Sequence, residues 1–539
     1  MKMRGVPLAL VACGLGGYCA LFSAPLLGQQ PDATEERIKK LEEQLDSVTQ
    51  ELKRLKDEAA ASKQKPPAAS TETEALQKEV NQLKSEIAET KEQASATDAK
   101  LEQSGVRAYL GPGLVFEDPR GRWRLQVSAR AQLDYRTFEP NFANANTFSV
   151  RRARIGVGAS FLDYYYVYVE EEFANQATAP APSTGPQLTF AYIDFNWWRP
   201  GVRFRVGQFK PPIGLDNTML DLQTDFLERA LTQSLFQNLT YDAGAMVFGE
   251  PTAGLVYSAA LTNSTGQGNS QFQGNLQQVQ GDGFMSTFRL VYNFAEAFKM
   301  PDNVFHFGGT LQFSQQANSG ANSQSTPYSA ASVQTEARGL TFFIPQAFNP
   351  TNAASVVSNI DRTVFDIEAA VAHKNFKVQG DYVQVEYSGT QIASSAKFDR
   401  TLKAYYVTLG WVLSGEYYSD WYREGTFVRP RPANNFDWSR GSGWGLWEAN
   451  LRYSYFDGTD FNTGNPQFTG RPGTSTSFPN ITQGTNKADA YSVGLKWQPN
   501  LYTRLMINYI HTQFDTPVTV NGKQTSYENA ITLRVQGDF

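Results

Sequence analysis

The C-terminal part of the chain alternates strictly between apolar and polar residues. One face of the last segment, residues 531–539, carries Ile531, Leu533, Val535, Gly537 and Phe539, and the other carries Thr532, Arg534, Gln536 and Asp538. Such a period of two predicts a strand with one apolar and one polar face. In a transmembrane barrel these faces meet lipid and a wet lumen, whereas an edge strand of a soluble sandwich shows the same local pattern.

The segments upstream favour the barrel, because alternating stretches of about ten residues recur from Trp123 onwards. The connection 161–164 is short, as expected of a periplasmic turn. Polar stretches that predict extracellular loops lie at about 262–282, 315–337, 346–360 and 458–487. At about 25 residues per strand and connection, residues 106–539 predict one all-β antiparallel transmembrane barrel of about 16 strands, or 18, enclosing an aqueous channel.

Residues 31–105 follow a heptad pattern instead. The apolar positions are Ile38, Leu41, Leu45, Val48, Leu52 and Leu55, then Leu76, Val80, Leu83 and Ile87, and more weakly Thr90, Ala94, Thr97 and Leu101. This spacing predicts an α-helical coiled coil that precedes the barrel as a periplasmic stalk, broken at Pro66 and Pro67. So narrow an apolar stripe indicates oligomerisation, and the alternative is a solvated helix or spacer.

The N-terminus, residues 1–28, has the features of a secretory signal peptide. Lys2 and Arg4 precede an apolar region at about 6–22. Both cysteines, Cys13 and Cys19, lie within this segment, so we expect no disulfide and no thiolate metal site in the exported protein. The stretch ending at Cys13 also resembles a lipobox, although so early a cysteine would leave almost no apolar region.

Composition agrees with an exported barrel that is nearly neutral. The chain has 25 Tyr, 36 Phe and 9 Trp against 3 His, and aromatic girdles line both rims of such barrels. Beyond residue 105 there are 34 Lys and Arg against 36 Asp and Glu. Any ion selectivity must therefore come from where the charges lie.

Four arginines fall on the polar faces of two predicted strands. Arg152 and Arg154 lie opposite Ala153, Ile155 and Val157. The other two are Arg203 and Arg205, in the segment 202–206. Guanidinium groups stay charged at any relevant pH and bind phosphate or carboxylate, so these four residues are candidates to line the pore. The alternative is that they pair with Glu170, Glu172 and Asp194 and brace the wall.

The segment after the second arginine strand is the most specific motif in the chain. It is Gly207-Gln208-Phe209-Lys210-Pro211-Pro212-Ile213-Gly214-Leu215-Asp216, followed by Phe226-Leu227-Glu228-Arg229. Two prolines end the strand and open a long loop. With the upstream Arg-Arg-Ala-Arg strand and the terminal Phe, most of residues 123–539 resembles the phosphate-selective porin O/P family. The resemblance implies a homotrimer of 16-stranded barrels in a bacterial outer membrane. It also implies an inward constriction loop carrying Lys210, Asp216, Glu228 and Arg229.

The chain departs from the family pattern in three respects. Asp216 stands where the family has Glu, and Leu227 stands where it has Met. The barrel is also nearly neutral, whereas a dedicated phosphate pore would concentrate lysines and arginines. We therefore predict a porin for passive diffusion of small hydrophilic or anionic solutes, without carrying over phosphate selectivity.

Two other classes of function are weighed against the porin. An enzyme is disfavoured, because His306, His373 and His511 accompany no nucleophile motif or metal-ligand cluster. A structural tether is the main alternative, with the barrel as membrane anchor and the stalk reaching the cell wall. The expected partners are thus outer-membrane lipid, copies of the same chain, solutes and the cell wall; we expect no nucleic acid, cofactor or metal.

Overall fold

The computed structural model describes most of the barrel region and part of the N-terminal region. The described residues are 41, 43–50, 53–54, 77–92, 105–174, 186–236, 241–263, 284–316, 331–345, 357–391, 397–461 and 484–539. The predicted signal peptide, residues 1–28, lies outside them. Among the described residues no helix is both long and apolar enough to cross a membrane.

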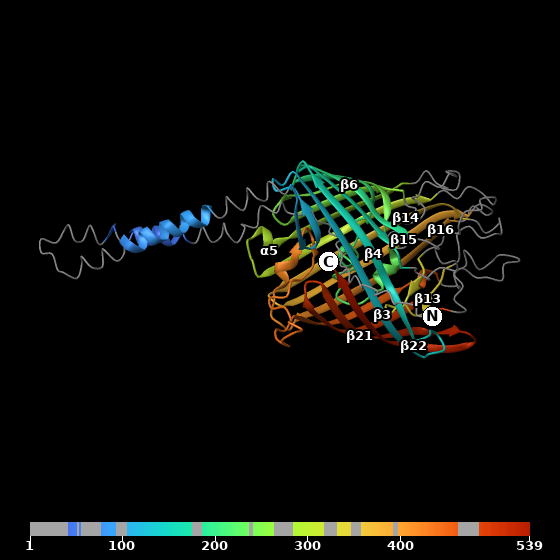
Figure 1. The fold of residues 1–539 in the computed structure, drawn as a ribbon. Helices are drawn as coiled ribbons and strands as arrows, with labels where there is room; N and C mark the ends of the chain where they lie inside the picture. Colours follow the sequence, from blue (N-terminus) through green and yellow to red (C-terminus); the bar gives the residue numbers. More distant parts are fainter. Residues whose placement is uncertain are drawn as a thin grey trace, which may run out of the picture. The chain divides into compact units, whose positions relative to one another are not determined.

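The main body is a closed antiparallel barrel of 16 strands, and two short strands extend its sheet (Figure 1). The first barrel strands are β3 (Trp123–Glu139), β4 (Thr147–Phe161), β5 (Tyr165–Glu172), β6 (Gln187–Trp198), β7 (Val202–Phe209), β8 (Asp242–Thr252), β9 (Leu255–Thr262) and β10 (Met285–Asn293). The remaining ones are β11 (Asn303–Gln316), β14 (Val357–His373), β15 (Phe376–Gln391), β16 (Lys397–Val412), β19 (Leu446–Asp457), β20 (Lys487–Asn500), β21 (Thr503–Val520) and β22 (Lys523–Asp538). The two extra strands are β1 (Arg107–Gly111) and β2 (Gly113–Glu117).

The last strand closes the barrel as its alternation predicts. β22 pairs antiparallel with β3, with Leu533 opposite Tyr135. Ile531, Leu533 and Val535 are exposed on the outer face, whereas Arg534 is buried on the inner face. Apolar side chains continue around the outside of the wall, as a lipid-facing surface requires. The predicted all-β class and the count of about 16 strands are confirmed.

Several irregular elements lie in the connections between barrel strands. They are α3 (Leu215–Thr218), α4 (Thr232–Leu235), α5 (Phe294–Ala297), β12 (Val333–Gln334), β13 (Thr341–Phe343), η3 (Tyr418–Trp421), β17 (Tyr422–Arg423), β18 (Thr426–Phe427) and η4 (Thr459–Phe461). The connection 413–445 is long, although it lies at the end of the barrel where β4–β5 and β14–β15 are joined by short turns. The sequence analysis did not predict a long insert at this end.

The inner face of the barrel is not polar throughout, and here the expectation of a uniformly wet lumen is wrong. Val364 on β14, Val383 and Val385 on β15, and Leu402 and Ala404 on β16 are completely buried. They form one apolar core with side chains of three connections: Ile213, Leu231, Leu235, Phe236, Val333, Leu340, Phe342, Phe343 and Phe461. Burial against these inserts stabilises inner-face aliphatic side chains that would be unfavourable against water.

The described N-terminal residues are helical at 43–50 and 77–92. In the second stretch Val80, Ile87 and Thr90 are buried and Leu83 is half-buried, while most of the residues between them are exposed. The heptad positions therefore share one covered face, as predicted from their spacing. Assembly of this face into a coiled coil between chains stays a prediction.

Candidate channel constriction

The connection between β7 and β8 forms a loop inside the barrel, described at residues 210–236 and hereafter called the inward loop. Pro211 and Pro212 end β7 because proline has no N–H to donate to the sheet. Gly214 then turns the chain with φ of 66°. A Cβ at this position would lie 3.0 Å from the Phe236 ring and 3.3 Å from Asp381 Oδ2. Glycine therefore permits both the backbone conformation and the close approach to the wall.

The inward loop is bonded to strands on both sides of the lumen. The strand residues that contact it through hydrogen bonds or ion pairs include Gln132, Thr310, Arg362, Lys377, Asp381, Asn450, Arg452 and Arg534. Arg534 Nη1 donates to the carbonyl of Leu227 at 2.7 Å, and Lys377 Nζ lies 2.8 Å from Asp225 Oδ1. These strands include β3 and β22 at the closure and β11, β14 and β15 far from it, so the loop crosses the lumen.

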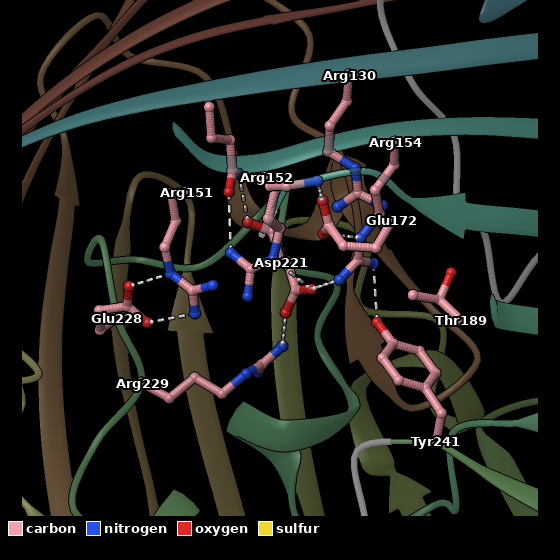
Figure 2. A network of polar contacts seen from close by, with 12 residues as sticks. Arg130, Arg151, Arg152, Arg154, Glu172, Thr189, Asp221, Glu228, Arg229 and Tyr241 are labelled. Carbon is pink, nitrogen blue, oxygen red and sulfur yellow. Dashed lines mark hydrogen bonds and ion pairs between the residues drawn. The ribbon is translucent and has the colours of Figure 1, made fainter. Parts of the chain in front are cut away.

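Arginines of β4 meet the inward loop through Asp221 (Figure 2). Arg152 Nε lies 3.2 Å from Asp221 Oδ2, and Arg229 Nη2 donates to Asp221 Oδ1 at 2.9 Å. Burial by itself raises the pKa of Asp221, but the guanidinium groups of Arg152 and Arg229 hold it well below its usual range. Asp221 is thus an anionic bridge between the barrel wall and the loop.

Arg154 is held by carboxylates of the adjacent strand β5. Its Nε donates to Glu172 Oε2 at 2.6 Å and its Nη1 donates to Glu170 Oε1 at 2.9 Å. Nη1 also donates to the Tyr241 hydroxyl at 2.8 Å. Arg130 on β3 shares Glu170, with Nη2 at 2.9 Å from Oε2. These bonds hold both guanidinium groups against Glu170.

Glu228 on the inward loop binds a second group of arginines. Its Oε1 accepts from Arg136 Nη2 at 2.6 Å and from Arg151 Nε at 2.7 Å, and Arg534 Nη2 lies 3.4 Å away. Burial alone raises the pKa of Glu228, yet Arg151 and Arg136 hold it well below its usual range. The carboxylate therefore stays charged and neutralises part of a strongly cationic region.

Lys210 opens the inward loop as a buried cation. Among the described residues it forms no ion pair within 4.0 Å. Burial lowers the pKa of Lys210 well below its usual range, and the neighbouring Arg229 lowers it further. Asp216, next in the motif, lies 3.8 Å from Arg229 and accepts a hydrogen bond from the Ala230 backbone at 3.0 Å. The four predicted constriction residues are thus all on the inward loop.

Arg203 and Arg205 lie in a separate group on β7. Arg205 donates two hydrogen bonds to Asp194, at 2.6 and 2.7 Å, and its guanidinium lies 3.7 Å from the centroid of the Tyr192 ring. Arg203 Nη2 lies 3.1 Å from Glu424 Oε2 on the 413–445 connection. This geometry fits the bracing alternative for both residues, and their predicted pore-lining role stays untested.

Counted over the described residues, the region around the inward loop has an excess of positive charge. The cations are Arg130, Arg136, Arg151, Arg152, Arg154, Lys210, Arg229, Arg338 and Arg534, and the anions are Asp134, Glu170, Glu172, Asp216, Asp221 and Glu228. The eight arginines stay charged and face six anions, so the excess is two without Lys210, whose lowered pKa favours the neutral amine. We call this set the arginine cluster.

Sequence reasoning missed several members of this cluster. Arg136 lies on β3 and Arg534 on β22, and alternation places Arg534 on the inner face, so a search of all inner-face arginines would have found it. Asp221 and Tyr241 lie in irregular segments, where no periodic signal marks the direction of a side chain. Their role depends on the path of the inward loop.

The 413–445 connection enters the barrel from the other end. Tyr418, Trp421, Tyr422 and Phe427 are buried and pack with Leu215 and Met219 of the inward loop, and with Val304, Ala370, Ala372, Val412 and Leu446 of the wall. Tyr418 donates to Glu448 Oε1 on β19 at 3.0 Å, and Arg289 Nη2 on β10 donates to the carbonyl of Gly425 at 2.8 Å. Inserts from both ends therefore meet inside the lumen.

A closed 16-stranded barrel with an apolar outer face and an ionised inward loop is the architecture of an outer-membrane channel for small solutes, a porin. The family model described as phosphate-selective porin O and P matches residues 125–539. The chain therefore belongs to this family, as its motifs predict. Family and fold indicate a channel in the outer membrane rather than an enzyme.

Solved structures of similar fold are distant in sequence. The anion-selective porin from Comamonas acidovorans is 10% identical, with a TM-score of 0.44, and the match covers 77% of this chain and 100% of that one. OmpT of Vibrio cholerae in its trimer form is 10% identical, with a TM-score of 0.42 and coverage of 77% and 99%. The channel DcaP of Acinetobacter baumannii is 9% identical, with a TM-score of 0.42 and coverage of 77% and 97%. Such values carry no argument about function or assembly. No curated protein matches the chain in sequence.

Proposed function

We propose that this porin passes small hydrophilic solutes with a preference for anions. The observation that carries the proposal is the excess of positive charge in the arginine cluster, where eight arginines face six carboxylates and the inward loop crosses the lumen. Charges fixed at a constriction act on a passing ion through little water and are weakly screened. An anion therefore meets a lower electrostatic barrier there than a cation does.

Selectivity for phosphate in particular is not part of the proposal. Arg154 is engaged by Glu170, Glu172 and Tyr241, and Arg151 and Arg136 both bond to Glu228. Bidentate capture of phosphate requires guanidinium N–H groups directed at the ligand. Because carboxylates already accept many of these donors, the cluster is better suited to a general electrostatic preference than to tight phosphate binding.

The assembly and the N-terminal region complete the proposal. Residues 1–28 would direct export, and residues 31–105 would form a periplasmic coiled-coil stalk with its break near Pro66. The barrel, residues 106–539, would assemble as a homotrimer, supported by the heptad pattern and by the family. A tether to the cell wall through the stalk is compatible with conduction.

The experiment is reconstitution of the purified chain in planar bilayers, with conductance and reversal potential measured across a KCl gradient. We expect steps of conductance and an anion-preferring reversal potential. Phosphate added afterwards should lower the conductance little. Strong block by phosphate would instead indicate a channel specialised for phosphate. An absence of any conductance would refute the channel proposal in favour of a barrel that only anchors a tether.

A further inference from the structure

A second charged region lies across the barrel from the arginine cluster. In the 16-strand order β14 is eight strands from β4, so the two strands are on opposite walls. Asp366 and Glu368 on β14 and Asp381 on β15 are buried on the inner face. Glu368 is directly opposite Asp381 in the strand register, and Asp216 of the inward loop donates its backbone N–H to Asp381 Oδ2 at 3.2 Å. Three wall carboxylates therefore lie in this region, next to Asp216, which the region shares with the arginine cluster.

Two of these carboxylates have a cationic neighbour. Glu368 lies 2.6 Å from Arg289 Nη2 and 3.3 Å from His306 Nε2. Asp216 is 3.8 Å from Arg229. By contrast, Asp366 and Asp381 have no Lys, Arg or His nitrogen within 4.0 Å in the described part of the chain. Asp366 and Asp381 are thus the carboxyl groups of this region without an ion pair among the described residues.

The same region collects buried polar atoms that lack hydrogen-bond partners. Within the described residues these atoms are both carboxylate oxygens of Asp366, Oδ1 of Asp381, Oε2 of Glu368, Oε1 of Gln379, the Tyr406 hydroxyl, Oγ1 of Thr218 and both amide atoms of Asn217. Asp366 is 1% exposed, and Asp381 and Tyr406 are 2% exposed. Tyr406, on β16, is the register partner of Asp381, so its unsatisfied hydroxyl is an observation independent of the acidic residues.

The donor or acceptor character of these atoms defines which ligand could form hydrogen bonds with them. Most are acceptors, while Asn217 Nδ2 is a pure donor. A buried carboxylate without a partner is strongly unfavourable, so a cation or a proton must compensate it. No group of three or more His, Cys, Asp or Glu able to hold a metal ion exists among the described residues. A ligand with several N–H donors and one positive charge fits best.

We propose that Asp366 and Asp381, with the Tyr406 hydroxyl, form a subsite for the primary ammonium group of a small amine or amino-acid-like solute. The inference deepens the proposed channel function, because a zwitterion could place its carboxylate toward the arginine cluster and its ammonium group at this wall. The helix α3 packs against β15, and Asp216 at its second position covers Asp381. An incoming amine must displace α3 locally, so block of conduction is the expected consequence of binding.

The test compares two probes of equal charge on reconstituted channels in KCl. n-Butylammonium has N–H donors, whereas tetramethylammonium has none. We expect n-butylammonium to lower single-channel conductance and tetramethylammonium to do so far less. Asp366→Asn and Asp381→Asn should each weaken the block by about tenfold, the loss of a charge-assisted hydrogen bond. Glu386→Gln, at an exposed carboxylate on β15, is the matched control and should leave the block unchanged.

Equal block of wild type, Asp366→Asn and Asp381→Asn would overturn the subsite while leaving the channel proposal intact. Calorimetric titration of n-butylammonium into the detergent-solubilised protein gives a readout that needs no conduction, and no binding heat in wild type would overturn the inference directly. Infrared spectra provide a third readout, since a protonated carboxyl band absent in Asp366→Asn and unaffected by n-butylammonium would show that a proton occupies the place of the ligand.

Discussion

The β3–β4 wall and the β14–β16 wall belong to one barrel and follow the same alternation, yet their inner faces differ. On β3 and β4 the inner face carries Arg130, Arg152 and Arg154, which bond to carboxylates of β5 and of the inward loop. On β15 and β16 it carries Val383 and Leu402, which pack in an apolar core with the inserts. Alternation therefore assigns a residue to a face, while the neighbours of that face decide whether it is wet.

The comparison also shows two ways of holding an insert in a lumen. Toward β4 the inward loop is fixed by directional ion pairs, such as Asp221 with Arg152. Toward β15 it is fixed by burial of Leu231, Leu235 and Phe236 together with the Lys377–Asp225 ion pair. Hydrophobic contact is nondirectional, whereas ion pairs need defined geometry. The arginine side can therefore keep charges oriented toward a solute, while the apolar side supplies cohesion.

The largest effect should follow from placing a charge in the apolar wall. Val383→Asp puts a carboxylate at a completely buried position and should cost about 3–4 kcal/mol of unfolding free energy. Val383→Thr, nearly the same shape with one hydroxyl, should cost about 1–2 kcal/mol. Urea unfolding in detergent, followed by the shift in gel mobility between folded and unfolded barrels, measures both. Equal and small losses of unfolding free energy in the two variants would mean that this inner face is hydrated.

The second-largest effect should follow from removing the carboxylate of Glu228, which binds Arg136 and Arg151. Glu228→Gln leaves Arg136 and Arg151 without the anion that lies 2.6 and 2.7 Å from them. We expect a loss of about 2–3 kcal/mol in unfolding free energy, because buried Arg151 loses its ion pair while Arg136 keeps Asp134 at 2.7 Å. The reversal potential should move further toward anions. A shift toward cations would contradict the assignment of the arginine cluster as the selective region.

Neutralising the β4 arginines should act on selectivity more than on folding. A triple variant that carries Arg151→Gln, Arg152→Gln and Arg154→Gln removes three positive charges. Its preference for chloride over potassium should fall by about tenfold, because the local focusing of anions is lost. Arg440→Gln, at an arginine with 82% side-chain exposure, is the control and should change nothing. An unchanged reversal potential in the triple variant would show that these arginines only brace the wall.

The smallest effect is expected from mild acid. The pKa of Glu228 is held well below its usual range, so the folded state keeps this carboxylate charged while the unfolded chain binds a proton near its ordinary pKa. Its contribution to stability is therefore complete at neutral pH and is lost as the pH falls through the depressed pKa. Reversal potentials between about pH 8 and pH 5 should stay constant. A cooperative change of the reversal potential near pH 5 would indicate that the pKa of Glu228 is not depressed.

From the sequence alone, strand periodicity and proline chemistry predict which residues face lipid, where the barrel closes and where the inward loop starts. Ile531, Leu533 and Val535 were assigned to the outer face, and Lys210 with its two prolines was assigned to the start of a loop, because strand periodicity and proline chemistry act locally. The inner position of Arg152 and Arg154 followed from the same rule. Local rules therefore recovered the class and part of the site, while the motif resemblance indicated the family.

Only the tertiary structure decided what those inner side chains meet. Arg152 contacts Asp221, 69 positions away along the chain, and Glu228 contacts Arg534, 306 positions away. Likewise, Val383 is dry because inserts cover it, and Asp366 lacks a partner although Arg289 lies close enough to pair with Glu368. Such contacts depend on loop paths across the lumen, which no periodic pattern encodes, since irregular segments carry no rule for the direction of a side chain.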